Sequence, residues 1–268
     1  MKRQSSVAGY FYPGKAEALE KMIRQMTLSG AKKEKAIAAV CPHAGYEYSG
    51  PVAGAVYSRV EIPGTCIVLG PSHRPIESLF AIMREGSWVT PLGEVPLETS
   101  LADLIISRAP GVEEDAEAHR HEHSLEVQVP FIQFFRKEAA IVPVCVSHEA
   151  SLADLEGLGK GMADAVREYG RDALIIASTD MSHYVTRKTA EKKDFMAIDR
   201  MLKLDPRGLH RVVEEENISM CGYQPATAAL VAALELGARR AELVRYQTSG
   251  DRTGDYSEVV GYAGVLVI

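Results

Sequence analysis

The chain has 268 residues, of which 46% are hydrophobic and 25% are charged, and its formal net charge is −6. No Pro/Gly/Ser-rich linker, charge run or low-complexity tract divides it, so we expect one domain that spans residues 1–268. We do not expect nucleic-acid binding, because it requires a concentrated basic face that this sequence lacks. A small molecule or a peptide is the expected ligand.

The sequence also predicts a cytoplasmic protein. After its first basic residues, the N-terminus continues with Gly9, Tyr10 and Pro13 instead of the apolar stretch of a signal peptide. No apolar run approaches the ~20 residues that span a bilayer, so we expect no membrane segment. Four cysteines lie far apart without a C-x-x-C pair, which is typical of a reducing compartment; they are Cys41, Cys66, Cys145 and Cys221.

Short β-branched apolar runs alternate with stretches of helical periodicity along the chain. In chain order, the sequence predicts helix 16–26, strands 36–40, 66–69 and 79–83, helices 97–108 and 125–135, strand 140–146, helix 152–169, strand 173–177, helices 190–204 and 225–236, and strands 241–246 and 262–268. Most of these strands are continuously apolar, as strands buried on both faces are. The pattern predicts an α/β fold with a central mixed, largely parallel sheet flanked by helices.

Two of the predicted helices carry start signals. Ser151 is expected to cap the helix that begins at residue 152, and Pro225 lies in the first turn of a helix, where its missing N–H costs nothing. Gly157, Gly159 and Gly161 lie inside a helical pattern, so they predict close helix packing rather than a dinucleotide-binding loop. The chain has no G-x-S-x-G nucleophile elbow and no P-loop.

Histidines follow three of the predicted strands. The segments are Ala-Val-Cys-Pro-His43, Val-Leu-Gly-Pro-Ser-His73 and Ile-Ala-Ser-Thr-Asp180-Met-Ser-His183. Ligands of open α/β sheets bind at the carboxyl ends of the strands, so we expect these loops to converge on one crevice. The three histidines can then coordinate one metal ion. The alternative is three ordinary hydrogen-bonded loop histidines.

Cys221 stands just before the predicted helix 225–236. A helix N-terminus has unsatisfied N–H groups and a partial positive charge, which favour the thiolate that binds metals. The alternative is a small residue packed under the helix. Its combination with the histidines favours the interpretation as a ligand.

The segment from His119 to Glu126 is dense in histidine but has neither a zinc-finger nor an H-E-x-x-H spacing. We expect His119 and His121 to lie in a solvated loop, with Ser124 as the cap of the following helix. His123 and Glu126 are closer to that apolar helix and are the better candidates for pocket residues.

Five ordered motifs extend over nearly the whole chain from about Val7. They are Cys-Pro-His43-Ala-Gly-Tyr46, Gly-Pro-Ser-His73, Glu122-His123-Ser-Leu-Glu126, Ser-Thr-Asp180-Met-Ser-His183 and Met-Cys221-Gly-Tyr. Together they resemble the signatures of the Memo family. That family is similar in fold to class III extradiol dioxygenases, non-haem iron enzymes that open catechol rings with O2. The resemblance therefore implies a class III extradiol dioxygenase-like fold.

The resemblance also implies roles for individual residues. His43 and His73 match the two histidine ligands of the dioxygenase metal, and Cys221 stands where those enzymes have a glutamate ligand. His123 and His183 match their acid–base histidines. Three further residues are expected to support the metal ligands or to bind substrate; they are Asp180, Glu126 and Tyr46.

A thiolate is softer than a carboxylate and can be oxidised, so the expected cofactor is one metal ion, Fe(II) first, with copper or zinc as alternatives. The leading hypothesis is a metal-dependent redox enzyme related to the extradiol dioxygenases. The sequence does not identify its substrate. The alternatives are a non-catalytic module that binds copper, iron or a peptide in the same pocket, and a scaffold that retains the pocket as a relic. For prokaryotic members the resemblance implies radical-SAM and AMMECR-domain proteins as partners, and we expect a homodimer only because two-fold assemblies are common.

Overall fold

The computed structural model describes residues 1–268, and a mixed sheet forms its centre. Eight strands lie side by side in the order β10 (Ala241–Thr248), β11 (Gly261–Val267), β2 (Ala38–Cys41), β9 (Ala173–Ser178), β3 (Thr65–Pro71), β8 (Ala140–Val146), β4 (Phe80–Ile82) and β7 (Val112–Glu114). The central strands β2, β9, β3 and β8 are all parallel to their neighbours within this group. Antiparallel pairing begins outside them, where β11 joins β2 and β4 joins β8. The predicted mixed, largely parallel sheet is confirmed.

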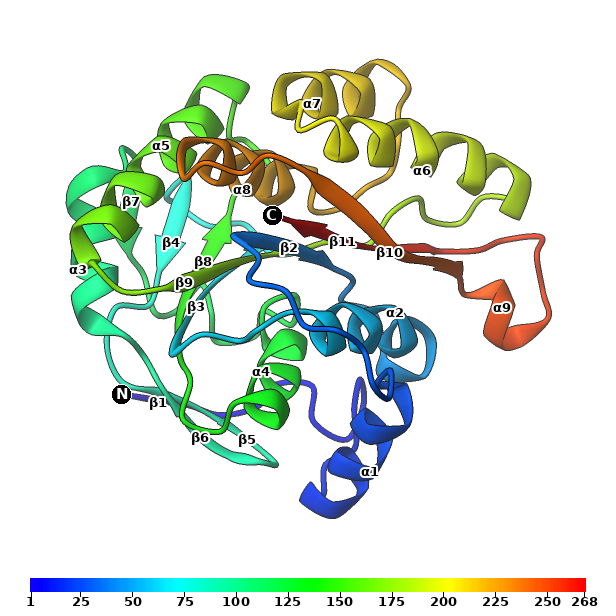
Figure 1. Ribbon diagram of the computed structural model, residues 1–268, viewed down its shortest axis with the longest axis horizontal. Coiled ribbons are helices and arrows are strands. Elements are labelled where there is room, and N and C mark those ends of the chain that lie inside the picture. Colours follow the sequence, from blue (N-terminus) through cyan, green and yellow to red (C-terminus); the bar gives the residue numbers. More distant parts are fainter.

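Helices cover both faces of this sheet (Figure 1). One layer consists of α3 (Thr99–Arg108), α5 (Leu152–Tyr169) and α8 (Tyr223–Glu235), extended by α6 (Arg187–Leu202) and α7 (Pro206–Glu215). The other layer consists of α1 (Ala16–Met26), α2 (Tyr46–Arg59) and α4 (Val129–Phe135), which follows the 3-10 turn η1 (Glu126–Gln128). The short helix α9 (Gly250–Thr253) connects β10 to β11. None of these helices combines the length and the apolar character that crossing a membrane requires.

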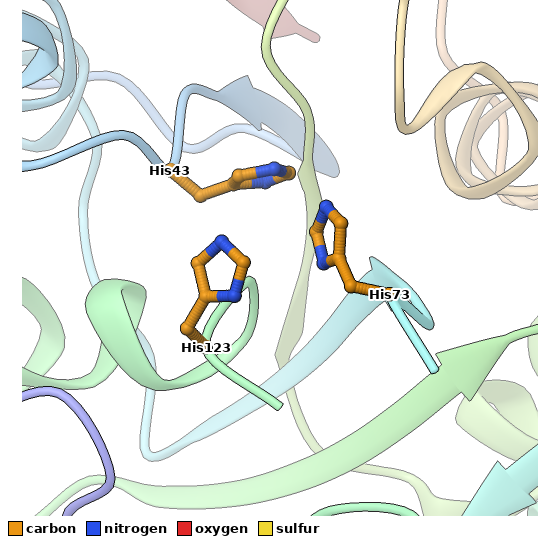
Figure 2. Close-up of side chains that lie close together, drawn as sticks. All are labelled: His43, His73 and His123. Atoms are coloured by element: carbon orange, nitrogen blue, oxygen red, sulfur yellow. The ribbon is translucent and has the colours of Figure 1, made fainter. Parts of the chain in front are cut away.

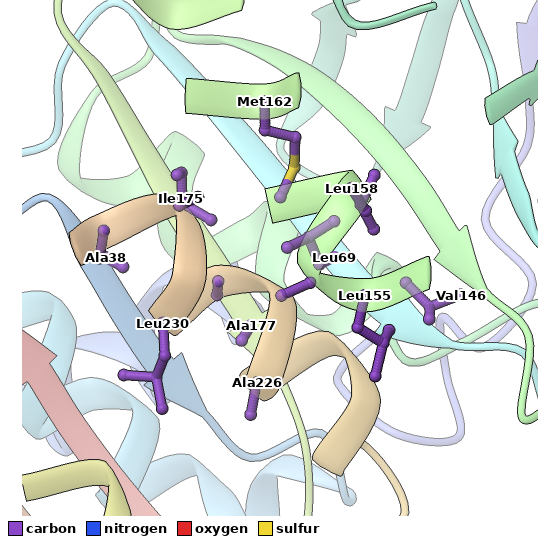
Figure 3. Packing of buried hydrophobic residues seen from close by; sticks show 14 of the residues in the cluster. Ala38, Leu69, Val146, Leu155, Leu158, Met162, Ile175, Ala177, Ala226 and Leu230 are labelled. Carbon is purple, nitrogen blue, oxygen red and sulfur yellow. The ribbon is translucent and has the colours of Figure 1, made fainter. Parts of the chain in front are cut away.

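The sheet is buried on both sides because alternate residues of its strands pack on opposite helical layers. In β2, Ala38 and Val40 belong to the core beneath α5 and α8, whereas Ala39 and Cys41 belong to the core beneath α2 and α4. Figure 3 shows the first of these cores, in which leucines of α5 and α8 lie over strand residues such as Ile175. Each buried Leu or Ile side chain contributes roughly 1.5–3 kcal/mol, so the two cores hold the strands firmly in register.

The seven predicted strands and six predicted helices are all present, and α1, α5 and β8 have the predicted bounds. The longest element that the sequence did not predict is helix α2. Its sequence contains Pro51, Gly50 and Gly54, which all have low helix propensity, but the two glycines let the helix pack closely against Met26 of α1. Helix α7 was also not expected, nor was a small second sheet formed by β1 (Lys2–Arg3), β5 (Ser87–Thr90) and β6 (Gly93–Pro96).

Of the two residues predicted to cap helices, Ser151 does so and Ser124 does not. Ser151 caps α5 in a capping box with Asp154, as expected. The prediction that glycines of α5 permit close packing is also confirmed, because a Cβ at Gly159 would lie 2.6 Å from the Cβ of Val231 in α8. The prediction for Ser124 is wrong: its hydroxyl donates to the Pro71 carbonyl at 2.9 Å, because this residue is buried against the end of β3 instead of starting a helix.

Strand β1 attaches the N-terminal segment to the histidine-rich loop. The Arg3 guanidinium is buried, donates to the His119 carbonyl at 2.5 Å and to the Glu122 carbonyl at 2.7 Å, and pairs with the Glu126 carboxylate at 2.7 Å. Its guanidinium carbon also lies 4.1 Å from the centre of the Trp88 ring. One buried side chain thus holds three points of the loop that leads into η1.

Candidate metal centre

The parallel strands of the sheet bring distant histidines to one edge. Cys41 at the end of β2 pairs with Ser178 at the end of β9, and β3 runs alongside β9 in the same direction. His43 and His73 follow directly after the ends of β2 and β3. Because parallel strands end at the same edge, the fold brings both imidazoles together, with ring centroids 5.4 Å apart, as the sequence predicted.

A third imidazole completes a cluster at this edge. His123 comes from the loop before η1, and Figure 2 shows its ring together with those of His43 and His73 around a shared space. One ligand nitrogen from each ring lies within 4.8 Å of the other two. The side chain of His43 is 2% exposed, whereas those of His73 and His123 are 34% and 23% exposed. The cluster is therefore closed behind His43 and open to ligands in front, and it can hold a metal ion.

Cys221 lies beside His43, next to this cluster. Its Sγ lies 3.2 Å from Nε2 of His43, and the backbone N–H of Asp180 donates to the same sulfur at 3.3 Å. The residue precedes Gly222, the N-cap of α8. The expected meeting of Cys221 with His43 is therefore present, although the sulfur is not one of the three atoms that lie within 4.8 Å of one another.

The expectation that helix α8 favours a Cys221 thiolate is not met in the metal-free chain. Burial raises the pKa of Cys221 well above its usual range, and the nearby Asp180 carboxylate raises it further. Desolvation of a negative charge thus outweighs the hydrogen bonds from Asp180 and Thr179 that favour the thiolate. The sulfur is a thiol at neutral pH unless a cation displaces its proton.

Asp180 and His183 follow β9 but do not join the cluster of three. The Asp180 carboxylate accepts the backbone N–H of His43 at 2.8 Å and that of Ala44 at 3.3 Å, so it fixes the His43 loop. Burial raises the pKa of Asp180, although these hydrogen bonds oppose the shift. The His183 ring donates from Nδ1 to the Ser219 carbonyl at 2.8 Å, because a carbonyl oxygen can only accept. In the neutral form of this ring, Nε2 therefore carries the lone pair.

Two imidazoles of the cluster, those of His43 and His123, are held neutral. Burial lowers the pKa of His43 to about 3, with a further contribution from the nearby His73. Burial and the neighbouring His43 lower the pKa of His123 to about 4. Neutral imidazole is the form that ligates a metal, so both rings are in the binding form at neutral pH.

Comparisons with known proteins agree with this architecture. The sequence model of a family described as Memo-like protein matches residues 3–266. The chain belongs to the Memo family. Proteins named MEMO1 family protein are 43% identical in Pyrobaculum arsenaticum, with 98% of each chain covered, and 42% identical in Methanosarcina acetivorans, with 99% of this chain and 98% of the relative covered. The relative from Methanothermobacter thermautotrophicus is 43% identical and covers 98% of this chain and 99% of its own.

A solved structure also shares the fold of this Memo-family chain. The crystal structure of an uncharacterized protein from Escherichia coli K12 superposes with a TM-score of 0.57 and 13% sequence identity. The match covers 84% of this chain and 98% of the other. At this identity the likeness establishes the α/β fold alone.

Glu122 is a site residue that the sequence reasoning did not select. Its carboxylate accepts from Nδ1 of His73 at 2.9 Å, from the backbone N–H of His73 at 2.7 Å and from that of Ser124 at 2.8 Å. Burial raises the pKa of Glu122, but the hydrogen bonds from His73 and Ser124 outweigh burial and hold it below its usual range. The carboxylate therefore orients the His73 ring with Nε2 free. Its position directly before His123 was the available signal.

Two other expected pocket residues have their polar atoms engaged elsewhere. The carboxylate of Glu126 accepts hydrogen bonds from the N-terminal segment, including the Tyr12 hydroxyl at 2.6 Å and the guanidinium of Arg3. The Tyr46 hydroxyl donates to the Val127 carbonyl at 2.6 Å. Both side chains are buried and hold the protein around the site together, so neither is part of the ligand set proposed below.

His119 is not in a solvated loop, which corrects the expectation from sequence. It is completely buried, its Nε2 donates to the Ala81 carbonyl at 3.0 Å, and its Nδ1 lies 3.4 Å from the Cys145 sulfur. The hydrogen bonds of Arg3 pull this part of the loop inward, where sequence polarity alone predicted solvent. His121 is exposed, as expected.

Proposed function

We propose that this chain is a metal-binding Memo protein whose ion is held by His43 and His73 together with His123 or Cys221. The observation that carries the proposal is the three imidazole nitrogens that lie within 4.8 Å of one another at the open edge of the sheet. The chemistry of the donors fits a metal, because two of these rings have lowered pKa values and the third is oriented by a carboxylate.

Two third ligands are available, and they favour different metals. His123 would complete an all-nitrogen set, which suits Fe(II), copper or zinc. Cys221, at 3.2 Å from His43, would add a soft sulfur that suits copper and zinc. We retain Fe(II) as the first expectation, and copper or zinc as the alternatives.

We further propose that the site performs redox chemistry on a small molecule, as the family's likeness to extradiol dioxygenases suggests. When bound by these residues, Fe(II) would supply redox chemistry toward O2 and a small substrate. The protein's own contribution would come from His183, whose Nε2 can accept a proton while Nδ1 stays bonded to the Ser219 carbonyl. If His123 holds the metal, His183 alone keeps the acid–base role.

Anaerobic loading with Fe(II), followed by oxygen-uptake assays over a panel of catechols and other small acids, tests the redox proposal. We expect about one bound ion per chain, substrate-dependent uptake, and loss of both in His43→Ala. His121→Ala is the control, because it removes an exposed histidine of the same region. Absence of bound metal in the loaded wild-type protein would refute metal binding, and absence of uptake with every substrate would refute the oxygenase activity.

A non-catalytic role in binding copper, iron or a peptide is the second candidate, and the Cys221 thiol beside His43 is the observation that favours it. This role predicts tight Cu(I) binding that Cys221→Ser abolishes, without any substrate-dependent redox reaction.

All four cysteines of the chain are free, which fits the proposed reducing cytoplasm. The proposed radical-SAM and AMMECR-domain partners rest on the family resemblance, and co-purification from a prokaryotic host would test them.

A further inference from the structure

A buried chain of polar groups lies behind His43, and the proposed function does not use it. Its members are the hydroxyl of Tyr57, the amide of Gln128, the hydroxyl of Ser178 and the carbonyl of Ser124. All four residues are at most 1% exposed. Buried polar groups of this kind require complete hydrogen bonding, so the direction of each bond can be worked out from its chemistry.

The Gln128 amide has only one orientation that satisfies its neighbours. Its Nε2 lies 2.9 Å from the Pro42 carbonyl, which can only accept, so the NH2 group must face that oxygen. Its Oε1 then accepts the hydroxyl of Tyr57 at 3.0 Å. The second N–H of the amide donates to Oγ of Ser178 at 2.7 Å. Gln128 is therefore a donor toward Ser178.

Ser178 has a single proton, and the Ser124 carbonyl takes it. The two oxygens are 2.6 Å apart, and since a carbonyl cannot donate, the Ser178 hydroxyl must. If this proton turned toward His43 instead, two lone pairs would face each other across that short distance. Oγ of Ser178 also lies 3.1 Å from Nδ1 of His43. With its proton committed, Oγ can only accept there, so Nδ1 of His43 must donate.

We infer that Ser178 is a positioning residue that fixes His43 as the tautomer protonated on Nδ1, with Nε2 left as a lone pair at the candidate metal centre. Nε2 is the atom that lies 3.2 Å from the Cys221 sulfur. In the metal-free chain it accepts the thiol proton of Cys221, and in the loaded protein it is the ligand atom. The assignment of the tautomer stands on the buried network, and only its consequence for metal affinity rests on the proposed function.

Nitrogen NMR of the metal-free protein tests the tautomer directly. Ring nitrogens labelled with 15N are correlated with the ring protons, and the His43 signals are identified by their absence in His43→Gln. We expect protonated Nδ1 and unprotonated Nε2 in the wild type at pH 7. A proton on Nε2 of His43 in the wild type would overturn the inference without any need for a variant to fold.

Ser178→Ala then tests the cause. We expect the fixed tautomer to give way to a mixture, and Zn(II) affinity to fall by about 10-fold or more, as losses of ligand-supporting groups do. The matched control is Ser182→Ala, which removes a buried hydroxyl without a hydrogen-bond partner and is expected to change neither readout. An unchanged His43 tautomer in folded Ser178→Ala would contradict the role of Ser178.

The two proposals fail separately in this experiment. A wild type with the expected tautomer but no Zn(II) binding would refute the metal site and leave the tautomer network intact. A wild type that binds Zn(II) with His43 protonated on Nε2 in the metal-free form would leave the metal site intact and refute the network.

Discussion

His119 and His123 belong to one loop, yet the fold uses them in opposite ways. Both ring nitrogens of His119 are engaged by protein, and its ring packs edge-on against Trp88 at a centroid distance of 5.8 Å. The ring of His123 instead stacks on that of His73 at 4.4 Å and remains partly exposed. A histidine with both nitrogens bonded to protein is part of the core, whereas one with a free nitrogen beside two other imidazoles can bind a ligand.

The largest effect is expected when the loop that holds both histidines loses its anchor. Arg3→Met leaves the buried Glu126 carboxylate without its cation and removes the donors to the carbonyls of His119 and Glu122. We expect a loss of about 3–5 kcal/mol in the free energy of unfolding, measured by urea denaturation at pH 7. Lys2→Met is the control, because its exposed pair with Glu94 is worth at most about 1 kcal/mol. Similar losses for both variants would contradict a special role for Arg3.

His123→Ala separates the pocket histidine from the core histidine. We expect it to lower Zn(II) affinity by roughly 100-fold, about 2.7 kcal/mol, with little change in unfolding of the metal-free protein. Competition with a chelating dye measures the affinity. If His123→Ala binds as tightly as the wild type while Cys221→Ser does not, the third ligand is the thiolate and the assignment of His123 is wrong.

The pH dependence of stability provides the complementary test on His119. Burial, followed by the Arg3 charge, lowers its pKa to about 4, whereas the unfolded chain has the ordinary value near 6.5. Protonation therefore favours the unfolded state, and the stabilisation present above pH 7 is lost as the pH falls from 6.5 toward 4. Between pH 7 and pH 5 we expect the wild type to lose about 2 kcal/mol more than His119→Gln. The control His121→Gln should show the same pH dependence of the free energy of unfolding as the wild type. Parallel pH profiles for the wild type and His119→Gln would contradict this prediction.

Glu122 lies between His119 and His123 in the sequence, and its substitution is expected to have the smallest of these effects. Glu122→Gln keeps the size of the side chain but weakens the acceptor that orients Nδ1 of His73. We expect Zn(II) affinity to fall by about 10-fold, measured by the same competition assay. Glu117→Gln changes an exposed carboxylate of the same loop and should have no effect. A wild-type affinity in Glu122→Gln would show that His73 does not depend on this carboxylate.

Local signals predicted the elements whose patterns are self-contained. The periodicity of α5 and its capping residue Ser151, and the continuous apolar run of β8, gave their exact bounds. Helix α2 was missed because Pro51 and two glycines argue against a helix locally, and only packing against α1 and the sheet compensates for them. Propensity is a weak prior, and tertiary contacts decide such cases.

The same division applies to the candidate site. Strand-exit position was sufficient to select His43 and His73, because parallel strands must end together. It could not separate His119 from His123, since the direction of each ring depends on contacts with residues far away in sequence, such as Arg3. Glu122 and Ser178 were not selected for a related reason: an ordinary Glu or Ser gains its role from the atom it faces.

The sequence by itself determined the family, the alternation of strands and helices, and the two histidines that the ends of the parallel strands bring together, because these depend on composition, periodicity and chain direction. The tertiary structure alone decided which loop histidine is core and which faces the cluster, where Cys221 lies, and which nitrogen of His43 is free. Hydrogen bonds and burial act over a few ångströms between residues that can be more than a hundred positions apart, as Cys221 and His43 are. Such contacts exist only once the chain has folded.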